Sequence, residues 1–127
     1  MARTAAQVTK EEMAVYRATA QRHWTQRQQA MVQRRERAWA LARQAAALLK
    51  EQFGASRVVV FGSLARGGLF HPHSDVDLAA WGLDERVYYR AVSQLLSLDP
   101  AIEVDLVIAE DVPATLRAVI EAEGVLM

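Results

Sequence analysis

Hydrophobic residues recur at helical spacing through the first third of the chain. No proline or glycine occurs from Thr9 to Phe53, and Thr9 followed by Glu12 is the capping-box pattern that opens a helix. Farther along, one apolar stripe repeats every three or four positions and is formed by Ala38, Leu41, Ala45, Leu48 and Leu49. This pattern predicts a helix over residues 33–53 that packs against a folded domain.

Toward the N-terminus the apolar stripe is thin and broken. Arginines interrupt it at positions 27 and 34, and the apolar residues that remain are Met13, Tyr16, Ala20, Trp24 and Met31. A single helix through both parts would be roughly 65 Å long at about 1.5 Å per residue, more than a small domain can cover. We therefore interpret residues 1–32 as an N-terminal helical arm, either a separate helix or an extension, whose apolar side chains need a partner.

Short β-branched runs alternate with helical patterns in the rest of the chain. Gly54 is placed to end the first helix, as a C-cap glycine does. The patterns that follow predict a strand at 57–62, a strand at 75–80, a helix at 84–97 opened by Asp84, a strand at 102–108 and a helix at 111–124.

The lengths of the connections limit how these strands can pair. The helix over 84–97 is long enough to cross between two parallel strands, whereas the link over 62–74 suits an antiparallel or irregular connection. The order of elements predicts an α/β (α+β) domain over residues 33–127, with a small mixed β-sheet flanked by helices.

Composition narrows the class of protein. The chain has 127 residues, of which 52% are hydrophobic, and it contains no cysteine. This length fits one packed domain, and the lack of cysteine excludes a disulfide scaffold, a cysteine-ligated zinc site and a thiol nucleophile. No apolar run approaches the roughly 18 residues of a membrane span, and the N-terminus lacks a secretory signal. We expect a cytoplasmic protein that makes no membrane contact.

Charge is unevenly distributed, although the chain is neutral overall. Residues 1–52 carry ten basic and four acidic side chains, a net charge of +6, and residues 53–127 carry −6. Two interpretations remain open: a solvated, arginine-rich helix that balances an acidic domain, or a basic arm that binds nucleic acid. Nucleic-acid binding would depend steeply on salt and would be lost without residues 1–35.

Three aspartates carry the clearest chemistry in the sequence. Asp75 and Asp77 are two apart in a predicted strand, so their side chains project from the same face. Asp105 lies in a run predicted to be buried, where a lone acid is costly unless it is paired. If the two strands are neighbours, the three carboxylates converge, and such a cluster needs cations or protons. Oxygen ligands without cysteine favour a hard ion such as Mg²⁺, with Mn²⁺ as the alternative.

The turn before these aspartates has the features of a phosphate site. Gly62 and Ser63 follow a strand, where glycine lets backbone N–H groups approach a ligand and the serine hydroxyl can donate to a phosphate oxygen. Arg66 lies three residues on and can bring positive charge to the same phosphates. A phosphate cradle beside an acidic trio implies that the ligand is a nucleoside triphosphate.

Each feature also has a purely structural explanation. Gly62 and Ser63 can form an ordinary tight turn, and the paired aspartates can be a solvated strand face. His71 and His73, in the connecting loop, can contact metal or nucleotide, but loop histidines are more often bystanders. The occurrence of all the features together and in order favours the functional interpretation.

In order and spacing, these motifs resemble the signature of the polymerase-β-like nucleotidyltransferases, and within them the minimal nucleotidyltransferases (MNT). The motifs are Phe61-Gly62-Ser63, then eleven residues, then Asp75-Val76-Asp77-Leu78, and later Val104-Asp105-Leu106. The resemblance covers about residues 36–124. It implies that Asp75, Asp77 and Asp105 hold two Mg²⁺ ions and that Asp105 helps to deprotonate the acceptor. It also implies that Gly62 and Ser63 bind the triphosphate, with Arg66 beside them.

The resemblance implies a reaction and a partner. The reaction is transfer of a nucleoside monophosphate, most readily AMP from ATP, to a hydroxyl with release of pyrophosphate. Standalone proteins of this type commonly pair with a small helical HEPN ribonuclease toxin and can silence it by adenylylating a tyrosine. The chain would then be the antitoxin of a HEPN/MNT pair.

Other roles for the chain remain open. It can be a non-catalytic nucleotide-binding or protein-binding antitoxin that acts by occlusion. It can also form homo-oligomers through its N-terminal helices. About 90 residues of predicted catalytic unit leave no separate acceptor-binding domain, so we expect the arm, a second copy or another protein to hold the acceptor.

Overall fold

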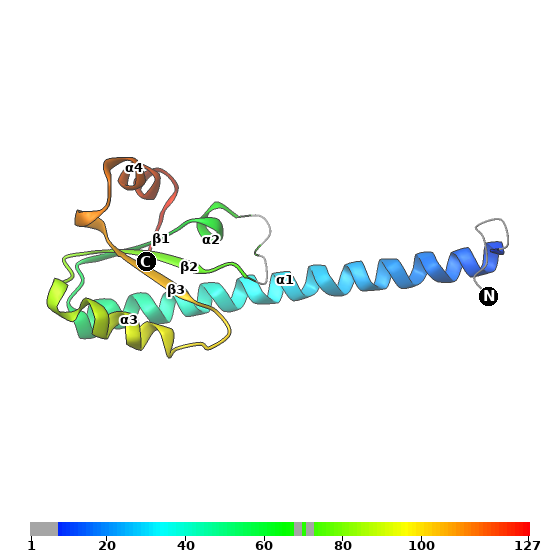
Figure 1. Cartoon of the computed structure of the whole chain (residues 1–127), viewed down its shortest axis with the longest axis horizontal. Helices are drawn as coiled ribbons and strands as arrows, with labels where there is room; N and C mark the ends of the chain where they lie inside the picture. Colours follow the sequence, from blue (N-terminus) through cyan, green and yellow to red (C-terminus); the bar gives the residue numbers. More distant parts are fainter. Residues whose placement is uncertain (1–7, 68–69, 71–72) are drawn as a thin grey trace.

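A computed structural model describes residues 8–67, 70 and 73–127 of the chain. A long helix comes first and small α/β elements follow it (Figure 1). In chain order the elements are α1 (Lys10–Phe53), β1 (Arg57–Phe61), α2 (Ser63–Arg66), β2 (Val76–Trp81), η2 (Glu85–Val87), α3 (Tyr88–Leu96), β3 (Val104–Ile108), η3 (Ala109–Asp111), α4 (Ala114–Glu123) and β4 (Val125–Leu126).

The four strands form one mixed sheet in the order β3-β2-β1-β4. β1 pairs with β2 and with β4 in antiparallel fashion, whereas β2 and β3 are parallel and are joined through η2 and α3. The predicted fold class, the parallel crossover and the antiparallel link are therefore confirmed. The two-residue strand β4 was not predicted, because two residues are too few to show an alternating pattern.

α1 is a single helix of 44 residues. The Thr9 hydroxyl accepts a hydrogen bond from the backbone N–H of Glu12 at 3.1 Å, and Gly54 ends the helix at φ 76° in the left-handed region. Of the two forms expected for the arm, the continuous extension is the correct one. The predicted boundary between residues 32 and 33 falls inside this helix, and its buried residues begin at Ala38.

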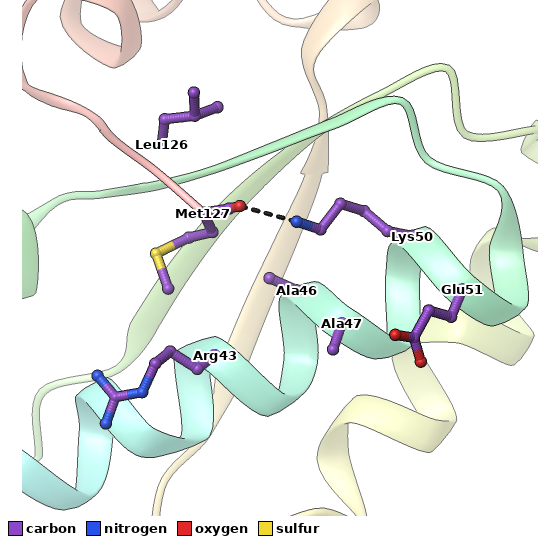
Figure 2. A pocket seen from close by; sticks show the side chains of 7 residues that line it. All are labelled: Arg43, Ala46, Ala47, Lys50, Glu51, Leu126 and Met127. Atoms are coloured by element: carbon purple, nitrogen blue, oxygen red, sulfur yellow. Dashed lines mark hydrogen bonds between the residues drawn. The ribbon is translucent and has the colours of Figure 1, made fainter.

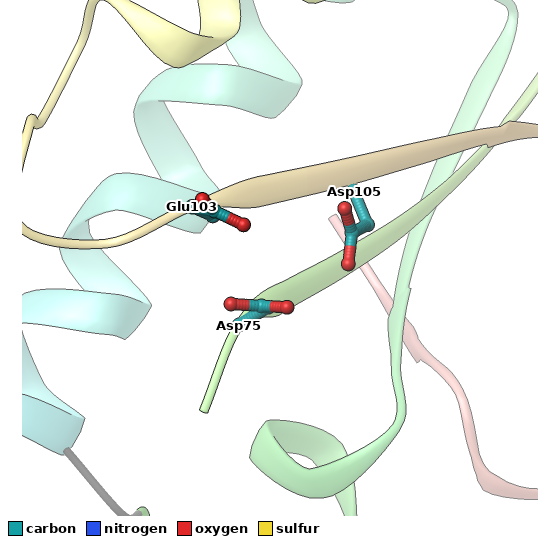
Figure 3. A group of neighbouring side chains, drawn as sticks. All are labelled: Asp75, Glu103 and Asp105. Atoms are coloured by element: carbon teal, nitrogen blue, oxygen red, sulfur yellow. The ribbon is translucent and has the colours of Figure 1, made fainter. Parts of the chain in front are cut away.

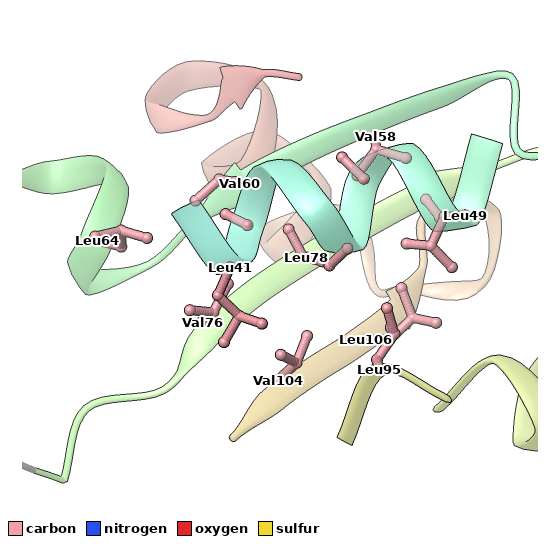
Figure 4. Packing of buried hydrophobic residues seen from close by; sticks show 14 of the residues in the cluster. Leu41, Leu49, Val58, Val60, Leu64, Val76, Leu78, Leu95, Val104 and Leu106 are labelled. Atoms are coloured by element: carbon pink, nitrogen blue, oxygen red, sulfur yellow. The ribbon is translucent and has the colours of Figure 1, made fainter. Parts of the chain in front are cut away.

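The two faces of the sheet are covered differently. α1 and α3 lie on one face and α4 lies on the other (Figure 1). The larger hydrophobic cluster joins the docked part of α1 to alternate strand residues, with Leu41 and Leu49 close to side chains of β1, β2 and β3 (Figure 4). A smaller cluster lies under α4 and is built by Val59, Phe61, Ala79, Ala109 and Ile120. The strand period of two thus assigns alternate residues to two separate cores.

Several smaller expectations are also decided. Asp84 caps η2 through a 2.9 Å bond from the Arg86 N–H, so the predicted helix at 84–97 begins as a 3₁₀ turn. Of the adjacent tyrosines, Tyr88 packs inward and donates to the Leu106 carbonyl at 2.7 Å, whereas Tyr89 is 84% exposed. Trp81, the last residue of β2, is half-buried and lies beneath the Arg57 guanidinium.

The C-terminus closes back on α1. Lys50 donates to the backbone oxygen of Met127 at 2.8 Å, beside a hollow of about 410 Å³ between α1 and the end of the chain (Figure 2). This hollow contains none of the predicted site residues. In the described part of the chain, no helix combines the length and the apolar character that crossing a membrane would require.

Candidate active site

The predicted metal-binding aspartates come from two adjacent strands. Asp77 of β2 is the register partner of Asp105 of β3, and in a parallel pair the two side chains lie on the same face. That face also carries the small cluster under α4, which includes Ala79 from the second half of β2. Asp77 and Asp105 are therefore the second residues of β2 and β3, Asp75 immediately precedes β2, and the far half of this face is apolar.

A further carboxylate joins them. One oxygen from each of Asp75, Glu103 and Asp105 lies within 4.8 Å of the others, and the three side chains point toward one another (Figure 3). Glu103 was not predicted. Its signal was present in the sequence, because Glu103 is two residues before Asp105 and strand periodicity places both on one face.

The exposure of Asp105 differs from the prediction. The run was expected to be buried throughout, but β3 has its buried residues at Val104 and Leu106 while Asp105 is exposed. β3 is an edge strand, and only one face of it packs against the larger core. An acid on the open face needs no buried partner, so the argument from burial cost was wrong although the predicted position beside Asp75 was right.

Electrostatics connect these carboxylates closely. Desolvation first, then the charges of Asp105 and Asp75, raise the pKa of Asp77 to about 6, and Arg66 opposes the shift. The pKa of Asp105 is also raised, by desolvation and then by a hydrogen bond to Asp75 and its charge. Carboxylates held this close disfavour one another's charged forms, so the cluster favours an added proton or cation.

The Gly62 turn lies directly against this cluster. Gly62 has φ 76°, and a Cβ there would collide with the carboxylate of Asp77, the register partner of Phe61. Glycine is required both by the backbone conformation and by this close approach. The predicted phosphate turn and the predicted metal-binding acid are thus in contact.

Ser63 and Arg66 form the first and last residues of the one-turn helix α2. Ser63 is half-buried, and Arg66 is exposed and lies 3.6 Å from the Glu123 carboxylate of α4. Arg66 is close enough to Asp77 to lower its pKa, which places a positive charge beside the cluster. All six predicted site residues therefore belong to one neighbourhood at one end of the sheet.

A pocket of about 410 Å³ lies next to the acidic group and is lined by Arg34, His73, Asp75, Pro100, Ala101 and Glu103. His73 is exposed and belongs to this pocket, whereas His71 lies outside the described residues. The pocket borders the carboxylates on the α1 side, so a molecule seated in it would reach Asp75 and Glu103.

Comparison with known proteins agrees with this arrangement. The family model for polymerase beta, nucleotidyltransferase matches residues 43–127. The chain belongs to the polymerase-β nucleotidyltransferase family. The match begins inside α1, so the first 42 residues lie outside it. No curated protein matches the chain by sequence.

Solved structures with a similar fold come from toxin–antitoxin systems. The toxin–antitoxin MntA–HepT has a TM-score of 0.53 and 20% identity, covering 69% of this chain and 69% of that chain. A mutant toxin–antitoxin has a TM-score of 0.56 and 20% identity, covering 67% of this chain and 70% of that one. A toxin–antitoxin crystal structure with AMP-PNP has a TM-score of 0.54 and 25% identity, with coverage of 62% and 65%. The fold of this nucleotidyltransferase is therefore shared with toxin–antitoxin proteins.

The donor set fits a divalent cation. Three carboxylate oxygens within 4.8 Å, with no nitrogen or sulfur among them, match the oxygen ligands that hard ions prefer. Desolvation first, and then the neighbouring carboxyl groups, raise the pKa of Asp77 and of Asp105, so an added positive charge is favoured at both. Asp75, Glu103 and Asp105 can hold a metal, and Asp77 lies beside them.

Proposed function

We propose that this nucleotidyltransferase transfers a nucleoside monophosphate, AMP from ATP, to a hydroxyl of a partner protein. The observation that carries the proposal is the contact between the Gly62 turn and the Asp77 carboxylate, with Asp75 and Asp105 alongside. It brings a proposed phosphate site and a proposed divalent-cation site close enough for one ligand to occupy both. Such a pair suits a triphosphate, whose charge must be neutralised while its chain is held in line.

In this proposal the residues have separate tasks. The Gly62–Ser63 backbone and the Ser63 hydroxyl bind the β- and γ-phosphates, and Arg66 balances their charge. Asp75, Asp77 and Asp105, with Glu103 as an added ligand, would hold Mg²⁺, and Mn²⁺ is the alternative. When bound, divalent ions would neutralise the carboxylates and the charge that develops on the phosphates.

Proton transfer falls to Asp105. The acceptor oxygen attacks the α-phosphorus, the bond from that phosphorus to the bridging oxygen of pyrophosphate breaks, and the acceptor proton moves to the Asp105 carboxylate. Asp105 is exposed on the open face of β3, so an acceptor can reach it without moving the core.

The proposed acceptor is a HEPN-type toxin, with the chain as its antitoxin. Support comes from the toxin–antitoxin structures that share the fold, one of which contains AMP-PNP. The test incubates the chain with ATP labelled at the α-phosphate, Mg²⁺ and the product of the adjacent reading frame. We expect label on that protein, and loss of the label with Asp77→Asn.

Asp111→Asn is the matched control, because Asp111 is exposed in η3, past the other end of β3. This variant is expected to transfer label like the wild type. Absence of label with a folded chain that binds both ATP and the partner would contradict the enzymatic proposal.

A second candidate is a binding module that acts by occlusion. It is favoured by the arm, where Tyr16 is 61% exposed and Trp24 is 58% exposed, since exposed aromatic residues commonly anchor protein interfaces. It predicts that Asp77→Asn still neutralises the partner while Trp24→Ala does not, with Gln26→Ala as control. Loss of neutralisation in Asp77→Asn alone would reject this candidate.

A further inference from the structure

Three arginines in one turn of α1 reach across to the candidate site. They are Arg34, Arg35 and Arg37, and they lie upstream of residues 43–127, which match the family model. Their partners belong to two separate segments, one on each side of the site. This turn lies at the start of the docked half of α1, just before the first buried residue, Ala38.

Arg35 contacts α2, the helix that follows the Gly62–Ser63 turn. Its Nη2 donates to the Leu64 carbonyl at 3.1 Å, in a partly buried contact, and the same nitrogen lies 3.8 Å from the Cβ position of Gly67. Leu64 belongs to α2, which has a single turn, so its carbonyl is one of those that the helix itself leaves unused. The guanidinium thus fixes the helix that follows the Gly62–Ser63 turn.

Arg37 contacts the loop that leads to Glu103 and Asp105. Its Nε and Nη2 donate to the two carboxylate oxygens of Asp99 at 2.6 and 2.7 Å, and the Arg37 hydrogen bond lowers the pKa of Asp99. Asp99 also accepts from the Ala101 N–H at 2.9 Å. On the same loop, Arg34 donates to the Ala101 carbonyl at 3.2 Å, two residues before Glu103.

We propose that the Arg34–Arg37 turn of α1 is a positioning device that sets the distance between the phosphate turn and the carboxylate cluster. A helix is stiff along its axis, so groups attached to one turn keep a fixed separation. Arg35 orients the Gly62–Ser63 turn, and the Arg37–Asp99 pair orients the loop that enters β3 at Glu103 and Asp105. None of the three arginines needs to touch substrate.

This inference rests on the proposed function and adds a role to residues outside the family's matched segment. It predicts that α2 and the loop before β3 respond separately to substitution of Arg35 and Arg37. Arg35 donates a hydrogen bond to α2, whereas Arg37 and Arg34 donate hydrogen bonds to the loop before β3, and the Arg34 guanidinium also lies 5.7 Å from the centre of the Phe70 ring. A general loss of stability would affect α2 and the loop before β3 together.

The first experiment compares Arg35→Gln with the wild type by amide hydrogen exchange and by calorimetric titration with ATP and Mg²⁺. We expect faster exchange at residues 63–66, unchanged exchange at 101–105, and about tenfold weaker ATP binding, the size typical of losing a group that orients a ligand-binding residue. Arg35→Lys is expected to restore part of the affinity. Arg43→Gln is the matched control, because Arg43 lines the hollow beside Met127 (Figure 2).

The second experiment repeats the measurements on Arg37→Gln. Exchange is expected to rise at residues 101–105 and to stay unchanged at 63–66, with ATP affinity within about twofold of the wild type. In the transfer reaction, Arg35→Gln should raise the KM for ATP, and Arg37→Gln should lower kcat by roughly tenfold.

The results distinguish failure of the positioning role from failure of the proposed function. If the wild type binds ATP and both arginine variants match Arg43→Gln in exchange and affinity, the positioning role is overturned and the proposed function stands. If each variant raised exchange equally at residues 63–66 and at residues 101–105, the arginines would have a merely structural role. That result would also overturn the positioning role. If the wild type does not bind ATP, the proposed function fails and the positioning role fails with it.

Discussion

At Asp77, partial burial and two neighbouring carboxylates act in the same direction. Its pKa in the folded chain is about 6, against an ordinary value of 3.8, so the folded state binds the proton more tightly than the unfolded state does. This carboxyl therefore favours folding below about pH 4, and its contribution is lost as the pH rises through 6.

Asp77→Asn should accordingly stabilise the chain at pH 7.5 and change little at pH 4. The full shift corresponds to roughly 3 kcal/mol, and screening at a half-buried site reduces the expected gain to about 1 kcal/mol. Urea unfolding at both pH values measures it, with Asp111→Asn as the control. A gain of equal size at both pH values would contradict the electrostatic explanation.

Gly62 offers a second test at the scale of single residues. Gly62→Ala must strain a positive φ and also push the Asp77 carboxylate away. We expect the free energy of unfolding to fall by about 2 kcal/mol. Gly54→Ala is the matched control, because Gly54 has the same φ of 76° with open space around it. An equal loss in both variants would mean that the contact with Asp77 contributes nothing.

Among the elements, α1 combines two different environments in one helix. Its second half is buried against the sheet, with Leu41, Ala45 and Leu49 almost inaccessible to solvent. Its first half contributes no buried residue among those that the structure describes, and isolated helices are marginal in water. The arm also presents exposed apolar side chains at Met13, Tyr16, Trp24 and Val32.

Hydrogen exchange should therefore show a gradient along α1. Amides at 14–30 are expected to exchange faster than those at 42–52, because opening the arm exposes no core. Measurement on the isolated chain, over a range of concentrations, tests this. Equal protection of both halves would show that the arm is covered in solution, and protection that rises with concentration would identify a second copy as the cover.

At the scale of the whole molecule, the arm and the site-bearing domain should be separable. Removing residues 1–32 leaves the arginine turn and every buried contact of α1, so the denaturation midpoint should stay unchanged. Binding to the partner should weaken if the arm contributes to the interface. Calorimetric unfolding and partner titration on the same variant measure both. A lower midpoint would contradict the division at residues 32 and 33.

Much of the fold could be predicted because it rests on local rules. Thr9 and Gly54 bound α1 by capping, short β-branched and apolar runs mark β1 and β3, and alternation of polar and apolar residues marks β2. The candidate site followed from the same alternation, since Asp75 and Asp77 lie two apart. Glu103 was missed although it obeys the same rule, because its strand was interpreted as uniformly buried.

Local patterns in the sequence determined the elements, the shared face of Asp75 and Asp77, and the glycine at the turn after β1, because each depends on residues close together along the chain. Only the tertiary structure decided what lies far apart in sequence. It paired Asp77 with Asp105, left the outer face of β3 open, and placed Arg35 and Arg37 against Leu64 and Asp99. These contacts depend on strand order and helix docking, and no local pattern encodes either one.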